Sequence, residues 1–129
     1  MSLSVEDQLA IQQLYARYNH AIDFGRAEEW ANCFTPDGVF SSGTAGEYSG
    51  RDALTEFAKG FSSRIKARHW TNNLVIEPEG DGARGSCYLQ LLRLGGEAPV
   101  IMLTAVYEDT LVRTPEGWKF SRRTVRADA

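Results

Sequence analysis

His69 is the side chain of this protein best suited to acid–base chemistry. It is one of only two histidines, and it lies near the start of an apparent strand, Lys66 to Glu77, with the sequence KARHWTNNLVIE. Because strand side chains alternate between faces, one face carries His69, Thr71, Asn73 and Val75, and the other carries Arg68, Trp70, Asn72, Leu74 and Ile76. A histidine beside Thr and Asn on an inner face would look into a lined cavity, and its ring titrates near neutral pH. His69 is therefore either a general base or a buried histidine that only packs.

Three further side chains could complete a site around His69. Asp23, at the end of a predicted helix, either orients the ring by accepting a hydrogen bond from one nitrogen or is a plain loop residue; the pairing would need the helix to unwind there. Tyr18 lies on the apolar stripe of the same helix and either packs in the core or donates a proton to a leaving group. Arg123, near the end of the last strand, could hold an anion or pair with a carboxylate. Whether Arg122 or Arg123 points inward depends on the bend of the sheet.

Other chemistries find little support in the sequence. The glycines at 80, 82, 95 and 96 join strands and do not open a helix, so they do not form a phosphate-binding loop. There is no HExxH motif, and Cys33 and Cys87 lack the spacing of metal ligands. We expect both cysteines to be free, buried thiols, and we expect neither a metal nor a cofactor.

Length and composition indicate one ordinary globular domain spanning residues 1–129. The chain is 43% hydrophobic and 24% charged, and no apolar run is long enough to cross a bilayer. The first residues, MSLSVEDQLA, lack the basic and apolar blocks of a signal peptide, which predicts a cytoplasmic protein without a membrane partner. A formal net charge of -3 disfavours nucleic acid as a partner.

Apolar spacing predicts three helices in the first half of the chain. A capping box at Ser4 and Asp7 opens the first helix, which ends between Asp23 and Gly25. The acidic side chains of the helices, Asp7 among them, are expected to face solvent. The later elements are a helix with the stripe Ala27, Trp30, Ala31 and Phe34, a turn at 35–38, a short strand at 39–41, a mobile loop at 42–50, and a helix with the stripe Leu54, Phe57, Ala58, Phe61 and Ile65.

Four long strands follow, separated by turn-like segments. They are predicted at 68–77, 83–94, 100–112 and 118–126. Helices followed by a meander of strands indicate an α+β domain in which the helices cover one face of a strongly curved sheet. In the two longest strands, apolar residues occupy both odd and even positions and therefore both faces of the sheet. The face away from the helices should thus also be covered, as it would be by another copy of the chain in a homo-oligomer.

Five segments of the chain carry a family resemblance: AIQQLYARYNHAID, EEWANCFTPDGVF, YSGRDALTEF, ARHWTNNLVI and AVYEDTLVRTPEGWKFSRR. Together, and over essentially the whole chain, they resemble the SnoaL-like members of the nuclear transport factor 2-like superfamily. Within that group, their order and spacing are most similar to the gamma-hexachlorocyclohexane dehydrochlorinase type, with bile-acid 7α-dehydratase and scytalone dehydratase as related types. The resemblance implies a cone-shaped, curved mixed sheet wrapped around three N-terminal helices, the cystatin-like α+β barrel, assembled as a homodimer or homotrimer.

The same resemblance implies a cofactor-independent lyase that acts on a small hydrophobic cyclic molecule. An Asp-His dyad falls on Asp23 and His69, Tyr18 falls at the leaving-group position, and Arg123 matches a terminal arginine. Trp30, Phe40, Phe57, Cys87 and Leu89 are expected to contact the substrate. Two alternatives stay open: an isomerase of the ketosteroid type that uses the same base, and a non-catalytic binding or oligomerisation module like a dioxygenase β subunit.

Overall fold

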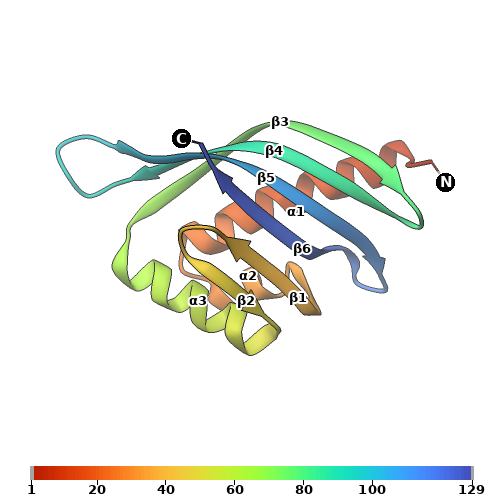
Figure 1. The fold of residues 1–129 in the computed structure, drawn as a ribbon, viewed down its shortest axis with the longest axis horizontal. Coiled ribbons are helices and arrows are strands. Elements are labelled where there is room, and N and C mark those ends of the chain that lie inside the picture. The colour runs from red at the N-terminus through yellow and green to blue at the C-terminus, as the bar shows by residue number, and fades with distance from the viewer. Residues whose placement is uncertain (1, 129) are drawn as a thin grey trace.

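A single mixed sheet curves around the helices in the computed structural model, which describes residues 2–128 (Figure 1). No helix in this part of the chain has the length and hydropathy needed to span a bilayer. The elements follow in the order α1 (Val5–Asp23), α2 (Ala27–Ala31), β1 (Phe34–Ser42), β2 (Gly46–Ser49), α3 (Arg51–Arg64), β3 (Ala67–Glu79), β4 (Gly82–Arg93), β5 (Val100–Thr114) and β6 (Gly117–Ala127).

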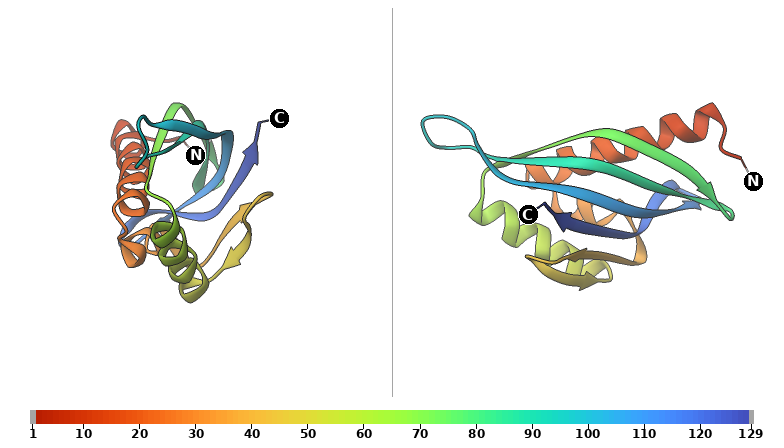
Figure 2. Two further views of the ribbon diagram at one scale, coloured as in Figure 1. Left: turned by 90° about the vertical axis from the view of Figure 1, so that its left-hand side faces the viewer. Right: turned by 45° about the horizontal axis from the view of Figure 1, so that its top comes forward.

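The six strands lie in the order β2-β1-β6-β5-β4-β3. The β1–β6 pair is parallel, and the other four pairs are antiparallel. Seen from the end, the sheet curls over the helices, which lie on its concave side (Figure 2). The predicted α+β fold with a curved mixed sheet is therefore confirmed, and each of the four long strands begins and ends within two residues of its predicted bounds.

The core fills the space between the concave face and the helices. The apolar stripe of α1 is buried as predicted, because residues three and four apart share one helix face. Aromatic side chains dominate the middle of this core, where the rings of Trp30 and Phe34 lie 5.2 Å apart and those of Phe34 and Phe120 lie 5.6 Å apart. The largest side chains that are less than 2% exposed include Trp30, Phe34, Phe120, Ile11, Leu54 and Leu111.

β1 and β2 differ from the sequence prediction. Phe34 begins β1 and does not continue α2, and the segment predicted as a turn lies inside the strand as a register shift between Phe34 and Val39. Gly38 permits this kink, because a β-carbon there would lie 2.7 Å from the β-carbon of Phe34. The predicted mobile loop contains β2, whose Tyr48 pairs with Phe40 in register. β2 has only four residues, too few for alternation to be recognised.

A bulge in β3 overturns part of the predicted alternation. Asn73 adopts a left-handed conformation, with φ 56°, and the pairing with β4 shifts register between Asn72 and Val75. Because a bulge adds one residue, the side chains beyond it change face. Leu74 and Ile76 therefore pack against the core, whereas Val75 is 56% exposed. The predicted grouping of Val75 with His69 was wrong for this reason.

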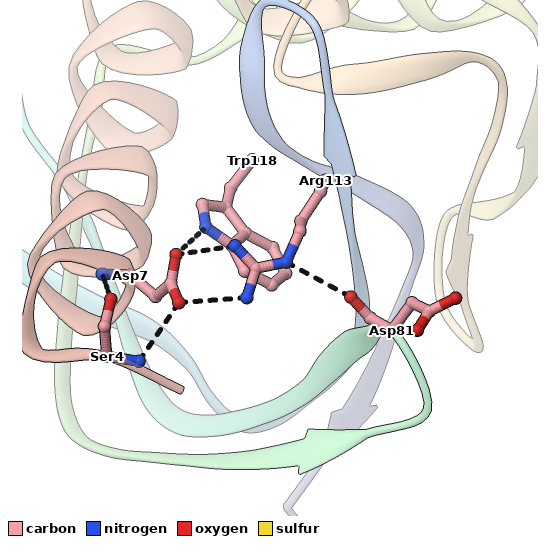
Figure 3. A network of polar contacts seen from close by, with 5 residues as sticks. All are labelled: Ser4, Asp7, Asp81, Arg113 and Trp118. Atoms are coloured by element: carbon pink, nitrogen blue, oxygen red, sulfur yellow. Dashed lines mark hydrogen bonds and ion pairs between the residues drawn. The ribbon is translucent and has the colours of Figure 1, made fainter. Parts of the chain in front are cut away.

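A polar network ties the start of α1 to the β5–β6 hairpin (Figure 3). The predicted capping box is present, with Ser4 and Asp7 bonded reciprocally at 3.0 Å. The Asp7 carboxylate also accepts bonds of 2.7 and 2.9 Å from Arg113 and one of 3.3 Å from Trp118. Arg113 in turn donates to the carbonyl oxygen of Asp81. The expectation that Asp7 merely faces solvent was wrong, because Arg113 reaches it from a strand that is distant in sequence.

Candidate functional site

The end of α1 places Asp23 beside β3. The helix continues intact to Asp23 and ends in a left-handed turn at Gly25, with φ 72°, where the Arg26 amide donates to the carbonyl of Ala21 at 2.8 Å. No unwinding is needed, contrary to the expectation from helical phase, because Asp23 is the last helical residue. Its side chain is free to turn toward His69.

Asp23 and His69 form a hydrogen-bonded pair. Nδ1 of His69 lies 2.6 Å from Oδ1 of Asp23, and the backbone N–H of His69 donates to both carboxylate oxygens at 3.1 and 3.0 Å. The two side chains are only 8% and 6% exposed. When Nδ1–H donates to the carboxylate, the neutral ring carries its free lone pair on Nε2. The arrangement is that of a base whose tautomer and orientation are fixed by a carboxylate.

His69 lies in the wall of a cavity of about 490 Å³. Its ring is 5.6 Å from that of Phe61, another residue of the wall. The volume lies within the range of small-molecule sites, roughly 300–1,000 Å³. Four of the five residues predicted to contact the substrate line this cavity, namely Trp30, Phe40, Phe57 and Leu89, and so do Tyr48 and Ile22.

A second, wider space of about 1,070 Å³ lies on the other side of the dyad, as an open groove along α1 and β3. Cys87, the fifth predicted contact residue, lines this groove and is absent from the cavity wall. Its lining mixes polar side chains such as Gln12, Asn19 and Thr71 with apolar ones such as Leu74 and Leu89. We assign the site to the smaller cavity, because aromatic side chains line it together with His69, as is typical of sites for small hydrophobic molecules.

Tyr18 belongs both to the core and to the cavity. It is 2% exposed and lines the cavity together with His69. Its ring contacts those of Trp30, at 5.4 Å between centroids, and Phe120, at 5.7 Å. Burial raises the pKa of the Tyr18 phenol, and the positive charge of Arg123 acts against that rise. The phenol is therefore a neutral hydrogen-bond donor beside the dyad.

Arg123 points inward and Arg122 points outward. The pairing of β5 with β6 shifts register between Thr110 and Leu111, which places Phe120 and Arg123 on the same face. Arg122 pairs with Glu47 at the surface, at 3.0 Å. Arg123 has no exposed surface and is not among the residues that line the cavity. The structure therefore places His69 and Tyr18 in the cavity wall, Asp23 behind His69 on the side of the groove, and Arg123 behind the wall.

Three residues near Arg123 were missed by sequence reasoning. Asp109 accepts two bonds of 2.8 Å from its guanidinium, and Tyr15 donates to the same carboxylate. Tyr107 lines the cavity with Tyr18. The sequence did contain one signal for Asp109: it is an acidic residue at a strand position that faces the core, and a buried carboxylate requires a partner. No sequence signal distinguishes Tyr107 from an ordinary core tyrosine.

Between residues 2 and 128, no three His, Cys, Asp or Glu side chains are grouped so that they could hold a metal ion. The two cysteines are buried free thiols, as expected.

Comparison with known proteins shows which family of sequences this chain resembles. A family model for the SnoaL-like domain matches residues 3–124. An uncharacterised protein of Mycobacterium tuberculosis, Rv2910c, is 31% identical over 126 residues, which cover 92% of this chain and 84% of the relative.

Solved structures agree with this match. An NTF2-like protein with a cystatin-like fold from Novosphingobium aromaticivorans has a TM-score of 0.86 and 26% identity, over 94% of this chain and 81% of that chain. A protein from Catenulispora acidiphila, solved in complex with S-DNPA, has a TM-score of 0.87 and 29% identity, over 97% and 96% of the two chains. The likeness to dehydrochlorinases and dehydratases stays a prediction, whereas the family is established: the chain belongs to the SnoaL-like domain family of the nuclear transport factor 2-like superfamily.

Proposed function

We propose that this protein is a cofactor-independent lyase that removes a proton from a small hydrophobic cyclic molecule bound in the cavity. The observation that carries the proposal is the Asp23–His69 pair, which is largely shielded from solvent and whose histidine lies in the wall of an aromatic cavity. A shielded, oriented imidazole beside an apolar space is suited to abstracting a proton from carbon. The related protein from Catenulispora acidiphila, solved in complex with S-DNPA, supports ligand binding by this fold.

The proposed reaction needs only side chains of this chain. Nε2 of His69 accepts the substrate proton, and Asp23 stabilises the imidazolium that forms. The electrons of the broken C–H bond form a C=C bond, and the leaving group departs from the neighbouring carbon with its electron pair. Tyr18 donates a hydrogen bond or proton to that leaving group, which makes hydroxide leave as water.

Isomerisation is the second candidate, and one observation favours it. Among the side chains that line the cavity, His69 is the one imidazole; the others that ionise are tyrosines and an arginine. A single base that takes a proton can return it to another carbon of the same substrate. Both reactions therefore begin with the same proton transfer to His69.

The first experiment measures that shared step. Candidate cyclic ketones and alcohols are incubated with the protein in D₂O, and hydrogen exchange and elimination are followed by NMR. For the compound processed fastest, His69→Ala should abolish both reactions, and Asp23→Asn should slow them by several powers of ten, on the order of the ~10⁴ effect of the same change in a serine-protease triad. The rate should rise with pH as the imidazolium loses its proton.

The matched control is His20→Ala, which removes the other histidine from the exposed side of α1. Melting temperature is recorded on the same samples. A merely structural His69 predicts that His69→Ala lowers stability by roughly 1–3 kcal/mol and leaves the rate per folded molecule intact. That result would overturn the proposed function.

A further inference from the structure

Arg64 lies at the rim of the cavity that contains His69. It is in the last turn of α3 and lines the cavity together with Phe57 and Phe61, which share one helix face with it at spacings of three and four residues. Arg64 is exposed to solvent, whereas Tyr18 in the same cavity wall is buried. Among the described residues that line the cavity, Arg64 carries the one permanent charge, and none is an Asp or a Glu. The cavity can therefore take an anionic group at its rim as well as an apolar body inside.

No carboxylate within residues 2–128 forms an ion pair with Arg64. A cation in the last turn of a helix is favoured by the helix dipole, and this interaction gives Arg64 a structural role. That role needs only a positive charge near the helix end. It makes no use of the fork of N–H donors on the guanidinium, whose geometry matches the two oxygens of a carboxylate.

Gly60 leaves room for the guanidinium of Arg64. The three atoms nearest to a β-carbon at position 60 would all belong to Arg64, namely Nη1 at 3.0 Å, Cζ at 3.8 Å and Nη2 at 3.9 Å. The Arg64 side chain therefore folds back by one turn of α3 and lies over Gly60. Glycine inside a helix is less favourable than alanine, because it loses more backbone freedom on folding. Its presence under the guanidinium indicates that Arg64 has a defined position beside the cavity.

Other cations lie at the same end of the molecule. Lys66 and Arg68 follow α3 in the chain, and Arg93 lies next to them because it pairs in register with Ala67. The ion pairs among residues 2–128 include none of these three cations. The end of α3, the start of β3 and the β4–β5 hairpin lie together at this end (Figure 1). Although the chain has a net charge of -3, its local positive charge here attracts anions toward the rim.

We propose that the cavity binds an amphipathic carboxylic acid, with its apolar ring among the aromatic side chains and its carboxylate on Arg64 at the rim. The neighbouring cations would steer the acid to the rim without touching it. This proposal rests on the proposed function only in taking the same cavity as the substrate site.

A carboxylate bound to Arg64 would also orient the ring. From the rim, the bound molecule would reach inward past Phe61, whose ring lies 5.6 Å from that of His69. The charge would thus stay at the solvent end while a ring carbon approaches the base. Arg64 would be a binding and specificity residue that does not touch the reacting carbon. Cyclic acids fit this arrangement, whereas a chlorinated hydrocarbon offers nothing to the guanidinium.

Binding of 2-naphthoate tests the carboxylate site without a known substrate. The neutral probe of the same shape is 2-naphthamide, and isothermal titration calorimetry measures both affinities. The wild type should bind the naphthoate about tenfold tighter than the amide, as expected for hydrogen bonds to a charged group. Arg64→Met should remove this preference and leave binding of the amide unchanged. Lys59→Met is the matched control, because Lys59 is an exposed cation of the same helix that does not line the cavity.

A carboxylate introduced at position 60 should compete with the ligand. Glu and Arg four residues apart on a helix, with Glu nearer the N-terminus, attract each other, so Gly60→Glu should occupy the guanidinium of Arg64. It should lower the preference for naphthoate, whereas the neutral Gly60→Gln should retain most of it. Both variants replace a helix glycine whose nearest neighbour is the end of a flexible side chain, so both should fold. Melting temperature is recorded for each.

Four results would overturn the proposal. They are equal affinity of the wild type for naphthoate and naphthamide, no naphthoate binding at millimolar concentration, a preference that survives in Arg64→Met, and a preference that Lys59→Met lowers as much as Arg64→Met does. The last result would show a general effect of charge with no contact at the rim.

The carboxylate site is separable from the proposed reaction. In the His69→Ala protein, the preference for naphthoate should persist, because the site does not need the base. Unchanged turnover in His69→Ala, with the Arg64 effect intact, would overturn the reaction and leave the carboxylate site standing. Hydrogen exchange lost in His69→Ala, with naphthoate binding indifferent to Arg64, would do the reverse. A preference that depends on His69 and not on Arg64 would place the carboxylate on the imidazole and overturn the proposal.

Discussion

The carboxylate of Asp23 accepts hydrogen bonds from both the ring Nδ1 and the backbone N–H of His69, 46 positions later in the chain. One side chain thus fixes the orientation of the imidazole and also anchors the first residues of β3 to the end of α1. The Asp23–His69 pair is part of the joint between helix and sheet, so both residues should contribute to stability in addition to the chemistry proposed for them.

Replacing Asp23 should separate these two contributions. Asp23→Ala leaves the buried backbone N–H of His69 without an acceptor, and we expect the free energy of unfolding to fall by roughly 1–3 kcal/mol. Asp23→Asn retains one oxygen for that bond and should lose less. Urea unfolding measures both, with Glu56→Ala on the exposed face of α3 as the control. Equal stability of Asp23→Ala and the wild type would show that the anchor contributes nothing.

The Asp7 network should make stability depend on acid pH. Hydrogen bonding from Arg113 holds the pKa of Asp7 well below its usual range. A carboxyl whose folded-state pKa lies below the unfolded value, ~3.9, contributes stability that is complete above that value and is lost as pH falls toward the folded-state pKa. The stability difference between the wild type and Asp7→Asn should therefore be largest near neutral pH and shrink below about pH 4.

Asp81→Asn serves as the control for Asp7, because only the backbone carbonyl of Asp81 accepts a bond from Arg113. Thermal unfolding of the three proteins from pH 7 to pH 2 gives the comparison. A difference between Asp7→Asn and the wild type that stays constant with pH would contradict the assigned role of the carboxylate.

Both cysteines should be unreactive in the native protein. Burial raises the pKa of Cys33 to about 11 and that of Cys87 to about 12, so neither carries appreciable thiolate at pH 8. A disulfide reagent such as dithiobisnitrobenzoate should label them slowly in buffer and rapidly in urea. The double variant Cys33→Ala, Cys87→Ala should fold and retain any proton exchange. Rapid labelling of one native thiol would reveal a nucleophile that this assignment overlooks.

The outer face of the sheet should form a contact between copies of the chain. Trp70 and Tyr88 are 60% and 54% exposed on the adjacent strands β3 and β4, and Tyr88 pairs in register with Val106 of β5. We propose a homodimer or homotrimer that covers this surface. Light scattering of the wild type at micromolar concentration should give a multiple of 14.4 kDa. Trp70→Glu with Tyr88→Glu should give the monomer, whereas Leu9→Glu on α1 should leave assembly unchanged.

Much of the site follows from sequence, up to the points where the backbone leaves ideal geometry. Alternation along β3 places His69 correctly, because the strand is regular as far as Thr71. It fails at Asn73, where a left-handed conformation in a residue other than glycine inserts an extra position. The inward orientation of Arg123 likewise depends on a register shift between β5 and β6. Bulges depend on tertiary packing, which single-sequence periodicity does not contain.

The cluster of Tyr15, Tyr107 and Asp109 around Arg123 could not be predicted from the sequence, for a different reason. Tyr107 and Asp109 lie on the buried face of β5, and only Asp109 is a residue type that signals a buried partner. Their partners, Tyr15 and Arg123, come from α1 and β6, and only the folded chain brings these side chains together. The pairing of Asp23 with His69 was accessible because the resemblance to known enzymes supplied it, whereas helical phase alone argued against it.

The parallel pairing of β1 with β6 has a consequence for how the chain is made. β1 ends at Ser42, and its parallel neighbour β6 spans residues 117–127. During synthesis on the ribosome, β1 can therefore join the sheet that holds His69 only after the last strand has been made. Contacts so distant in sequence slow folding and leave apolar surface exposed in the nascent chain. The wall of the cavity includes Val125 of β6, so the ligand site is complete only once the last strand has been added.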